Sequence, residues 1–255
     1  MFNLIKWEIK KSLRPGVLIL WALGLVLGFN STSTLYVLGI NEAYAGLFSK
    51  FYTVLAPIMG LAMFTMFSGS FVREYNSNVD GLIKASKNGK NQLVLAKFIA
   101  NGITASIINL SIFMVMLGRI IAKYKFEGLD LPLKSLWYFG NSGSNITILQ
   151  MILILILTII LGSFVFASIG LYLSSISKRA TLPFILGGLT MGIPYFIVFR
   201  GYKEVVFSIL VNGMYSQQIV RYGLPASYLI GYIAVALILI VGLYNLTKKV
   251  FLKER

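Results

Sequence analysis

The sequence contains no cysteine and no histidine among its 255 residues. The chain therefore cannot form disulfides, cannot bind zinc through thiolate or imidazole ligands, and cannot use a histidine as a catalytic acid, base or triad member. The G-x-x-x-x-G-K-[ST] loop by which many ATPases bind phosphate is also missing. We predict no catalytic residues in this chain, and no metal or cofactor bound by it.

Charged residues are scarce as well. Asp, Glu, Lys and Arg make up 12% of the chain, about half the usual share of a soluble domain, whereas hydrophobic residues make up 57%. Such a chain could not cover its own surface in water, so we expect a bilayer to be its solvent and residues 1–255 to form one transmembrane domain. The formal net charge is +15, but the basic residues lie in short clusters between apolar stretches. This pattern is typical of membrane topology rather than nucleic-acid binding.

Six stretches without charged residues predict membrane-spanning helices, because a span needs about 20 mostly apolar residues. They cover residues 15–30, 51–72, 98–118, 148–173, 181–199 and 226–244. The expected fold is all-α and polytopic, with the spans inside 15–244, an inner loop at 73–97 and a tail at 245–255. Most of the 23 basic residues fall on the inner side if the N-terminus is inside. The positive-inside rule then predicts a bacterial cell membrane protein with both termini cytoplasmic. A cleaved signal peptide is the alternative for the first stretch, and it would place the basic tail outside.

Residues 1–14 predict an amphipathic helix that lies at the inner membrane interface. Its apolar face comprises Phe2, Ile5, Ile9 and Leu13. Its predicted headgroup-contacting residues are Lys6, Trp7, Lys10 and Lys11. Pro15 should then redirect the chain into the bilayer. The alternative is an ordinary basic flank that only sets topology.

The inner loop at 73–97 contains a second amphipathic pattern. Val79, Leu82, Ile83 and Ser86 share one face of a short helix that the Asn88-Gly89 turn would end. A short amphipathic helix on an inner loop suits a groove on a soluble partner. A helix that rests on the membrane surface without a partner is the alternative.

The spans themselves contain few polar residues and no charged ones. Candidate residues for the lining of a cavity are Pro57, Thr65, Asn101 and Asn109. The two asparagines either line a polar seam or bridge neighbouring helices. Small-residue pairs at Gly24/Gly28 and Gly188/Gly192 predict close helix approach, and prolines at 57, 183 and 194 predict kinks. Without charged relays in the spans, transport against a gradient would need energy from another subunit.

The chain resembles the permease subunits of ABC-2 type ATP-binding-cassette exporters. Residues 1–11 are similar to the amphipathic connecting helix of that family. The family's pattern after the second span resembles Glu74, Asp80-Gly81-Leu82, Ser86, Lys90 and Lys97. The end of its fourth span resembles Ser168-Ile169-Gly170-Leu171, followed by Ser174 and Ser177-Lys178. Among relatives, the chain looks most similar to small permeases of Firmicutes that handle antimicrobial or amphipathic cytolytic peptides, including bacteriocin-immunity and modulin-type toxin exporters.

This resemblance implies a permease that pairs with a second permease, identical or paralogous, while ATP and Mg²⁺ are bound by separate ATPase subunits. The ATPase-coupling residues would be Glu74, Tyr75, Asp80, Gly81, Leu82, Ile83, Lys84 and Ser86. Short re-entrant helices are implied at 200–225, with 205–211 apolar enough to form one. The expected partners are the ATPase, membrane lipid and an exported amphipathic peptide or lipid-like substrate. The alternative function is a membrane accessory or immunity protein that binds a peptide or partner without transport.

Overall fold

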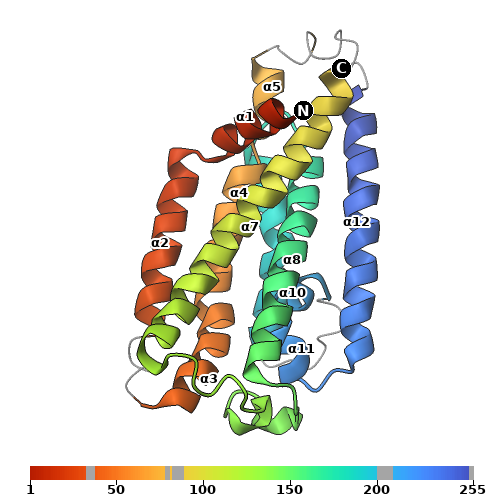
Figure 1. The fold of residues 1–255 in the computed structure, drawn as a ribbon. Helices are drawn as coiled ribbons and strands as arrows, with labels where there is room; N and C mark the ends of the chain where they lie inside the picture. The colour runs from red at the N-terminus through yellow and green to blue at the C-terminus, as the bar shows by residue number, and fades with distance from the viewer. Residues whose placement is uncertain (33–37, 78–80, 82–88, 200–208, 253–255) are drawn as a thin grey trace.

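The computed structural model describes residues 1–32, 38–77, 81, 89–199 and 209–252. Over these residues the protein is all-α, as predicted, and the helices form one elongated bundle (Figure 1). The long and medium helices are α1 (Phe2–Ser12), α2 (Pro15–Ser31), α3 (Ile40–Lys50), α4 (Ala56–Phe67), α7 (Gly89–Tyr124), α8 (Ile148–Ile176), α9 (Thr181–Phe199) and α12 (Ala226–Leu252). The short ones are η1 (Phe51–Leu55, a π-helical turn), α5 (Val72–Asn76), η2 (Leu133–Ser135), η3 (Gly140–Ser142), α10 (Ile209–Met214) and α11 (Gln217–Arg221).

Four helical stretches in the described residues are long and apolar enough to cross a membrane. They are Ile40–Asn76, Asn91–Tyr124, Ile148–Ile176 and Ala226–Phe251. A fifth crossing results if α1 and α2, which meet at 74°, count as one broken span, whereas α9 is apolar but shorter. These helices indicate a multi-pass membrane protein with four or five crossings by length and composition, fewer than the six predicted.

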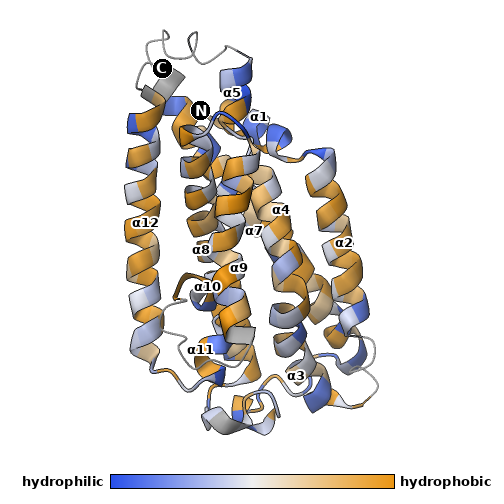
Figure 2. Cartoon of the chain, turned by 180° about the vertical axis from the view of Figure 1, so that it is seen from behind, coloured by the Kyte–Doolittle hydropathy of each residue, from blue (hydrophilic) through white to orange (hydrophobic). Residues whose placement is uncertain are grey.

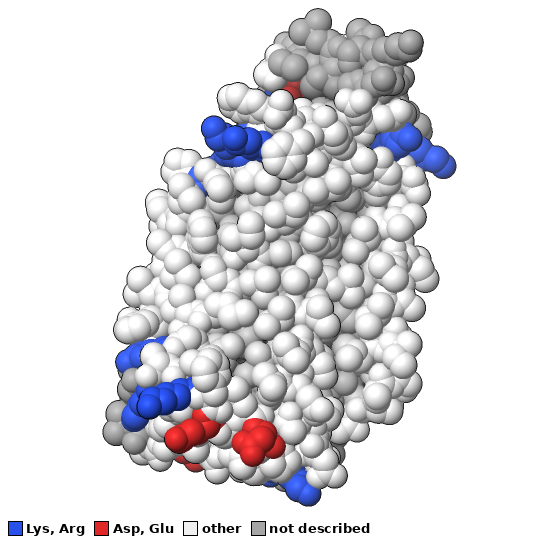
Figure 3. Space-filling view, viewed as in Figure 1, with Lys and Arg blue, Asp and Glu red and all other residues white. Residues whose placement is uncertain are grey.

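The outer surface of the bundle is largely apolar, as contact with a bilayer requires. Along α12, large apolar side chains such as Ile230, Leu237 and Ile238 point outward and are more than half exposed. Apolar residues predominate along the long helices, and hydrophilic ones gather mainly toward the helix ends (Figure 2). The face shown in Figure 3 has its Lys and Arg at the two ends with an uncharged band between. Hydrocarbon solvates such a band and water does not. The N- and C-termini lie at the same end of the bundle (Figure 1).

Two predicted helix starts are wrong, one by about three turns and the other by about two and a half. The second long helix begins at Ile40 rather than at residue 51, because the side chains from Ala43 to Phe48 are buried and continue the core. The helix expected from residue 98 begins at Gly89, because the charged residue before the apolar run, Lys97, is itself buried in the bundle. Charged residues at the ends of a helix conceal its true length when they have partners inside the protein.

The middle of the bundle is filled by aromatic rings from α3, η1 and α7. Phe51 packs edge-on against Phe113 with ring centroids 5.0 Å apart, and Tyr52 packs against Tyr215 at 5.4 Å. Tyr215 belongs to the segment of α10 and α11, whose side chains are almost all buried against α8 and its neighbours. Short buried helices therefore exist in the region where re-entrant helices were expected, although residues 200–208 lie outside the described part.

The two small-residue pairs behave differently. Gly24 and Gly28 of α2 lie against Ile112 and Met116 of α7, so close that a Cβ on Gly24 would come within 2.6 Å of the Ile112 side chain. This confirms the predicted close approach. Gly188 and Gly192 of α9 have no described atom within 4 Å of an added Cβ, so they make no such contact within the chain.

Candidate functional site

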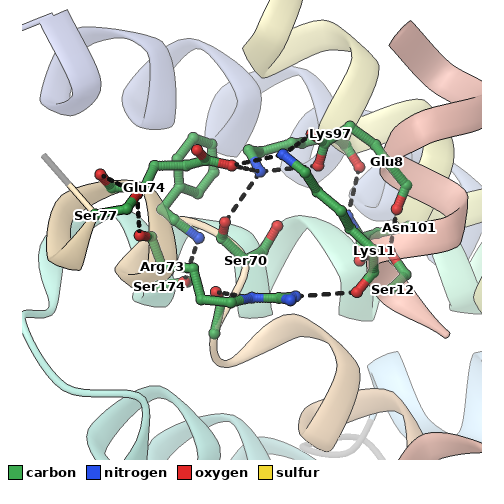
Figure 4. A network of polar contacts seen from close by, with 12 residues as sticks. Glu8, Lys11, Ser12, Ser70, Arg73, Glu74, Ser77, Lys97, Asn101 and Ser174 are labelled. Carbon is green, nitrogen blue, oxygen red and sulfur yellow. Dashed lines mark hydrogen bonds and ion pairs between the residues drawn. The ribbon is translucent and has the colours of Figure 1, made fainter. Parts of the chain in front are cut away.

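The end of the bundle that carries both termini also carries a buried polar cluster. Figure 4 shows its side chains, which come from α1, from the turn between α4 and α5, from α5 itself, from the first turns of α7 and from the last turn of α8. The cluster comprises Glu8, Lys11, Ser12, Ser70, Arg73, Glu74, Lys97, Asn101 and Ser174. The segment predicted as a loop at 73–97 includes α5 and the first turns of α7, which both lie at this end, and its residues 78–80 and 82–88 lie outside the described part.

Lys97 is the centre of the cluster and is only 1% exposed. Its ammonium nitrogen donates to Glu8 Oε2 at 2.8 Å, to Glu74 Oε1 at 3.0 Å and to the carbonyl oxygen of Ser70 at 3.0 Å. Three acceptors match the three donors of a lysine, so the charge is fully satisfied. Burying an unpaired ammonium group would cost several kcal/mol, whereas here two carboxylates and a carbonyl surround it. Lys97 thus joins α7 to both α1 and α5.

The turn between α4 and α5 contains main-chain carbonyl groups that have no helical hydrogen-bond donor, because the helix is interrupted there. Ser174 on α8 donates to the Ser68 carbonyl at 3.0 Å and accepts from the Phe71 amide at 3.0 Å. The Ser70 carbonyl accepts from Lys97, and the Gly69 carbonyl accepts from Arg73 Nε at 3.2 Å. Because each orphan carbonyl has a partner, the turn is a fixed junction between α4, α7 and α8.

The helix α1 lies across this junction with a polar side facing inward. Its buried residues are Glu8 and Ser12. Ser12 Oγ lies 3.1 Å from Asn101 Oδ1 on α7, and Arg73 Nη2 donates to the Lys11 carbonyl at 3.0 Å. The predicted apolar face is only half-buried, and Phe2 is largely exposed. The acidic and hydroxyl groups are buried instead because Lys97 and Asn101 offer them charged and polar partners.

Lys11 closes the cluster toward the surface. Its ammonium group contacts Glu8 Oε1 at 3.1 Å and Glu74 Oε1 at 3.2 Å, while its side chain stays 48% exposed. Beside it, a polar pocket of about 430 Å³ opens against Arg73, Glu74 and Lys97. Solvent can therefore reach the rim of the cluster through this pocket, although the ammonium group of Lys97 is buried.

The predicted coupling residues divide into two groups. Glu74 is buried in the cluster, and the Tyr75 hydroxyl donates to the Ser175 carbonyl on α8 at 2.9 Å. Gly81 is exposed. The remaining ones lie outside the described residues: Asp80, Leu82, Ile83, Lys84 and Ser86. Contact between any of these residues and an ATPase stays a prediction, but the Glu74 carboxylate already has two lysine partners inside the chain.

The residues predicted for the N-terminal helix lie on its outer side. Lys6 and Lys10 are exposed, Trp7 is 63% exposed, and Lys10 Nζ lies 5.3 Å from the centroid of the Trp7 ring. This arrangement fits headgroup contact, and Pro15 stands at the first position of α2, where the chain turns as predicted. Lys11 differs from the other three because it also pairs with the buried carboxylates.

The four candidate cavity residues do not come together. Asn101 contacts α1 through Ser12, and Asn109 donates to Ser163 Oγ on α8 at 2.9 Å, so both asparagines bridge helices. Thr65 is half-buried and faces α2. Pro57 alone among the four borders the apolar groove described next.

An apolar groove of about 330 Å³ lies between α4 and α9. Its lining includes Pro57, Gly60, Phe64, Gly188 and Phe196. Pro57 has no N–H to donate to the Thr53 carbonyl one turn earlier, and the π-turn η1 precedes it. The Tyr195 hydroxyl from α9 donates to that carbonyl at 2.8 Å instead. The groove therefore has one polar anchor, at its wall, and apolar surroundings.

Sequence reasoning did not single out Glu8 or foresee that Lys97 would be buried. Glu8 is the sole acidic residue among residues 1–14, which is the signal that could have identified it. Its partner is 89 positions away in the chain. Within the described residues, no three acidic side chains come together as metal ligands. Comparison of the chain with protein-family models, with curated proteins and with solved structures finds no match.

Proposed function

We propose that the chain is the membrane-spanning permease subunit of an ATP-driven exporter of the ABC-2 type. In this proposal a separate ATPase subunit binds the inner loop at 73–97 and hydrolyses ATP. The permease pairs with a second permease and moves a hydrophobic or amphipathic substrate, most simply an antimicrobial or cytolytic peptide. It crosses the cell membrane six times, with α2 and α9 as the two shorter spans and with both termini cytoplasmic.

The observation that carries the proposal is the contact of Lys97 with both Glu8 and Glu74. It ties the N-terminal helix, the segment that leads into the loop and the first turns of α7 into one polar junction. Force applied to the loop by a partner would reach α1, α5 and α7 together, because these elements share buried charges that are costly to separate. A permease whose sequence lacks a phosphate loop would use such a junction to couple to ATP hydrolysed by its partner.

The apolar groove between α4 and α9 supports the proposed substrate class. Its lining is apolar, and its volume of about 330 Å³ is near the lower limit for small-ligand pockets. A groove of this kind accommodates an apolar side chain or part of an acyl chain, and gives a sugar or an ion few polar partners. Transport of a strongly hydrophilic cargo by the purified complex would contradict this assignment.

Affinity purification from native membranes tests the proposal. The tagged chain should bring down an ATPase that has a phosphate loop, and the complex should hydrolyse ATP faster than the ATPase alone. Replacement of residues 79–86 by a Gly/Ser segment of equal length should leave the protein inserted and monodisperse but abolish the stimulation. The same replacement at residues 33–37, expected on the opposite side, is the matched control and should leave the stimulation unchanged.

Asp80→Lys tests binding of the ATPase more specifically than Glu74→Lys does. Reversal of Glu74 would place two positive charges beside each other in the buried cluster and so disturb the fold as well as any interface. If the chain purifies without an ATPase, yet protects cells against a peptide, the accessory or immunity function replaces the one proposed. Unchanged ATP hydrolysis after replacement of residues 79–86 would reject the coupling role of the loop.

A further inference from the structure

The chain turns sharply at residues 13–15, between α1 and α2, and this elbow carries an arginine that has no counter-ion among the described residues. Arg14 precedes Pro15, and its Nε and Nη2 atoms are enclosed by protein with no hydrogen-bond acceptor among the described residues. The guanidinium group lies on Gly69 in the α4–α5 turn, where an added Cβ would come within 2.7 Å of Nη1. Enclosed donors without an acceptor are costly, so this arrangement is incomplete in the protein alone.

A second guanidinium lies close to the first. Arg73 donates to the main-chain carbonyls of Gly69 and Lys11 rather than to a carboxylate. Burial, and then the positive charge of Arg73, lower the pKa of Arg14 to about 10. Arg14 therefore remains charged at neutral pH, beside a like charge. Two arginines that converge without a carboxylate between them form an arrangement that favours an anion.

The carboxylates of the neighbouring cluster compensate for this pair only in part, since Glu8 and Glu74 attract Arg73 but form no ion pair with either arginine among the described residues. The carboxylates of Glu8 and Glu74 are already shared by Lys97 and Lys11. Within the junction itself, four basic side chains thus surround these two acidic ones, namely Lys11, Arg14, Arg73 and Lys97, which leaves an excess of two positive charges before the exposed Lys6 and Lys10 are counted. An anion of one or two charges at the elbow would balance it.

The surroundings of the elbow indicate which anion fits. From Arg14 the helix α2 runs away with an outward apolar face that includes Leu18, Ile19 and Leu23, each more than 40% exposed. On the other side lies the outer face of α1, with the exposed Trp7 and Lys10. A ligand that satisfies both sides has a negative group at one end and long apolar chains at the other. Phospholipids have this form.

We propose that the elbow binds the phosphate group of an anionic phospholipid at Arg14 and Arg73, with the acyl chains along the exposed face of α2. Arginine suits this role because its guanidinium group donates strong hydrogen bonds to phosphate oxygens. The phosphate would supply the acceptor that the enclosed Nε and Nη2 atoms of Arg14 lack, once that side chain turns toward the lipid. A bound lipid would anchor α1 at the membrane surface and fix the angle between α1 and α2. The inference does not depend on transport, since it concerns the membrane environment of the chain alone.

Thermal unfolding of the purified protein in detergent tests the site. Short-chain phosphatidylglycerol should raise the midpoint of unfolding, because a ligand that binds the folded state stabilises it. Phosphatidylcholine with the same chains, and inorganic phosphate, should raise the midpoint much less. Arg14→Gln should weaken the effect of phosphatidylglycerol at least about tenfold in lipid concentration. Lys134→Gln, which removes an exposed charge near the opposite end, should leave it unchanged.

Two further variants keep the test decisive if Arg14→Gln folds poorly. Arg14→Lys keeps the charge but loses the guanidinium group, so it should fold and bind phosphatidylglycerol more weakly than the wild type. Gly69→Ala should displace the Arg14 guanidinium and have the same effect. An equal response to phosphatidylglycerol and phosphatidylcholine would overturn the proposal, as would a full response to inorganic phosphate alone. Undiminished binding by the Arg14 and Gly69 variants would overturn it too.

Discussion

Removal of Lys97 should be among the most damaging single changes at the polar end of the bundle. In Lys97→Met, three hydrogen bonds of 2.8–3.0 Å disappear, and the carboxylates of Glu8 and Glu74 are left with Lys11 between them. Two buried negative charges then share one half-exposed positive charge. Breaking a buried ion pair by removal of one partner costs about 3–5 kcal/mol. In a chain of this size that corresponds to a fall of roughly 10 °C in the midpoint of thermal unfolding.

The assay is thermal unfolding in detergent, followed by circular dichroism or by loss of the monodisperse peak. Lys11→Met is the graded control: its side chain is 48% exposed, so its loss should cost about 1 kcal/mol or less. Glu8→Gln on the Lys97→Met background should recover part of the loss, because it removes the uncompensated carboxylate. The destabilisation should also shrink as the pH falls, since an unpaired carboxylate can take up a proton. If the unfolding midpoint of Lys97→Met lies within about 2 °C of that of the wild type, the cluster does not hold α1, α5 and α7 together.

Two other substitutions test the packing of the bundle. Gly102→Ala places a Cβ within 2.3 Å of the Phe164 ring and should destabilise the α7–α8 contact by about 1–3 kcal/mol. Gly118→Ala on the same helix is the control, because its Cβ meets open space, and it should be neutral or slightly stabilising. Equal unfolding midpoints for the two variants would contradict this α7–α8 packing. Tyr195→Phe removes the hydroxyl that donates to the Thr53 carbonyl and should lower the free energy of unfolding by about 1 kcal/mol in the same assay. An unchanged unfolding midpoint would mean that this carbonyl has another donor.

Much of the helical layout could be predicted from the apolar runs alone. The fourth and fifth predicted stretches begin where α8 and α9 begin, because Thr147 caps α8 with a reciprocal contact to Gln150 and because charged residues precede α9. The beginning of the second long helix could not be read in this way. Glu42 and Lys50 flank its first turns, and their charges suggest a loop even though the residues between them are buried.

Sequence patterns could not predict the polar cluster. The local pattern of residues 1–14 predicts a helix that lies at the membrane interface, with no protein contact for Glu8. Glu8 is nevertheless buried, because Lys97, far along the chain, is buried opposite it. A buried charge pair reverses the usual rule that charged residues mark the ends of spans. The expectation of an uncharged bundle is therefore correct for the band between the ends and wrong at the end that carries the termini.

Background-free cysteine labelling tests the orientation on which the proposed function depends, since the natural sequence has no cysteine. Lys6→Cys and Lys134→Cys place single thiols at exposed positions in the N-terminal helix and in the segment between α7 and α8. A membrane-impermeant maleimide applied to intact cells should label Lys134→Cys, and should label Lys6→Cys only after the membrane is opened. Labelling of Lys6→Cys in intact cells would put the polar cluster and the loop outside, where no ATPase could bind them, and would contradict the account.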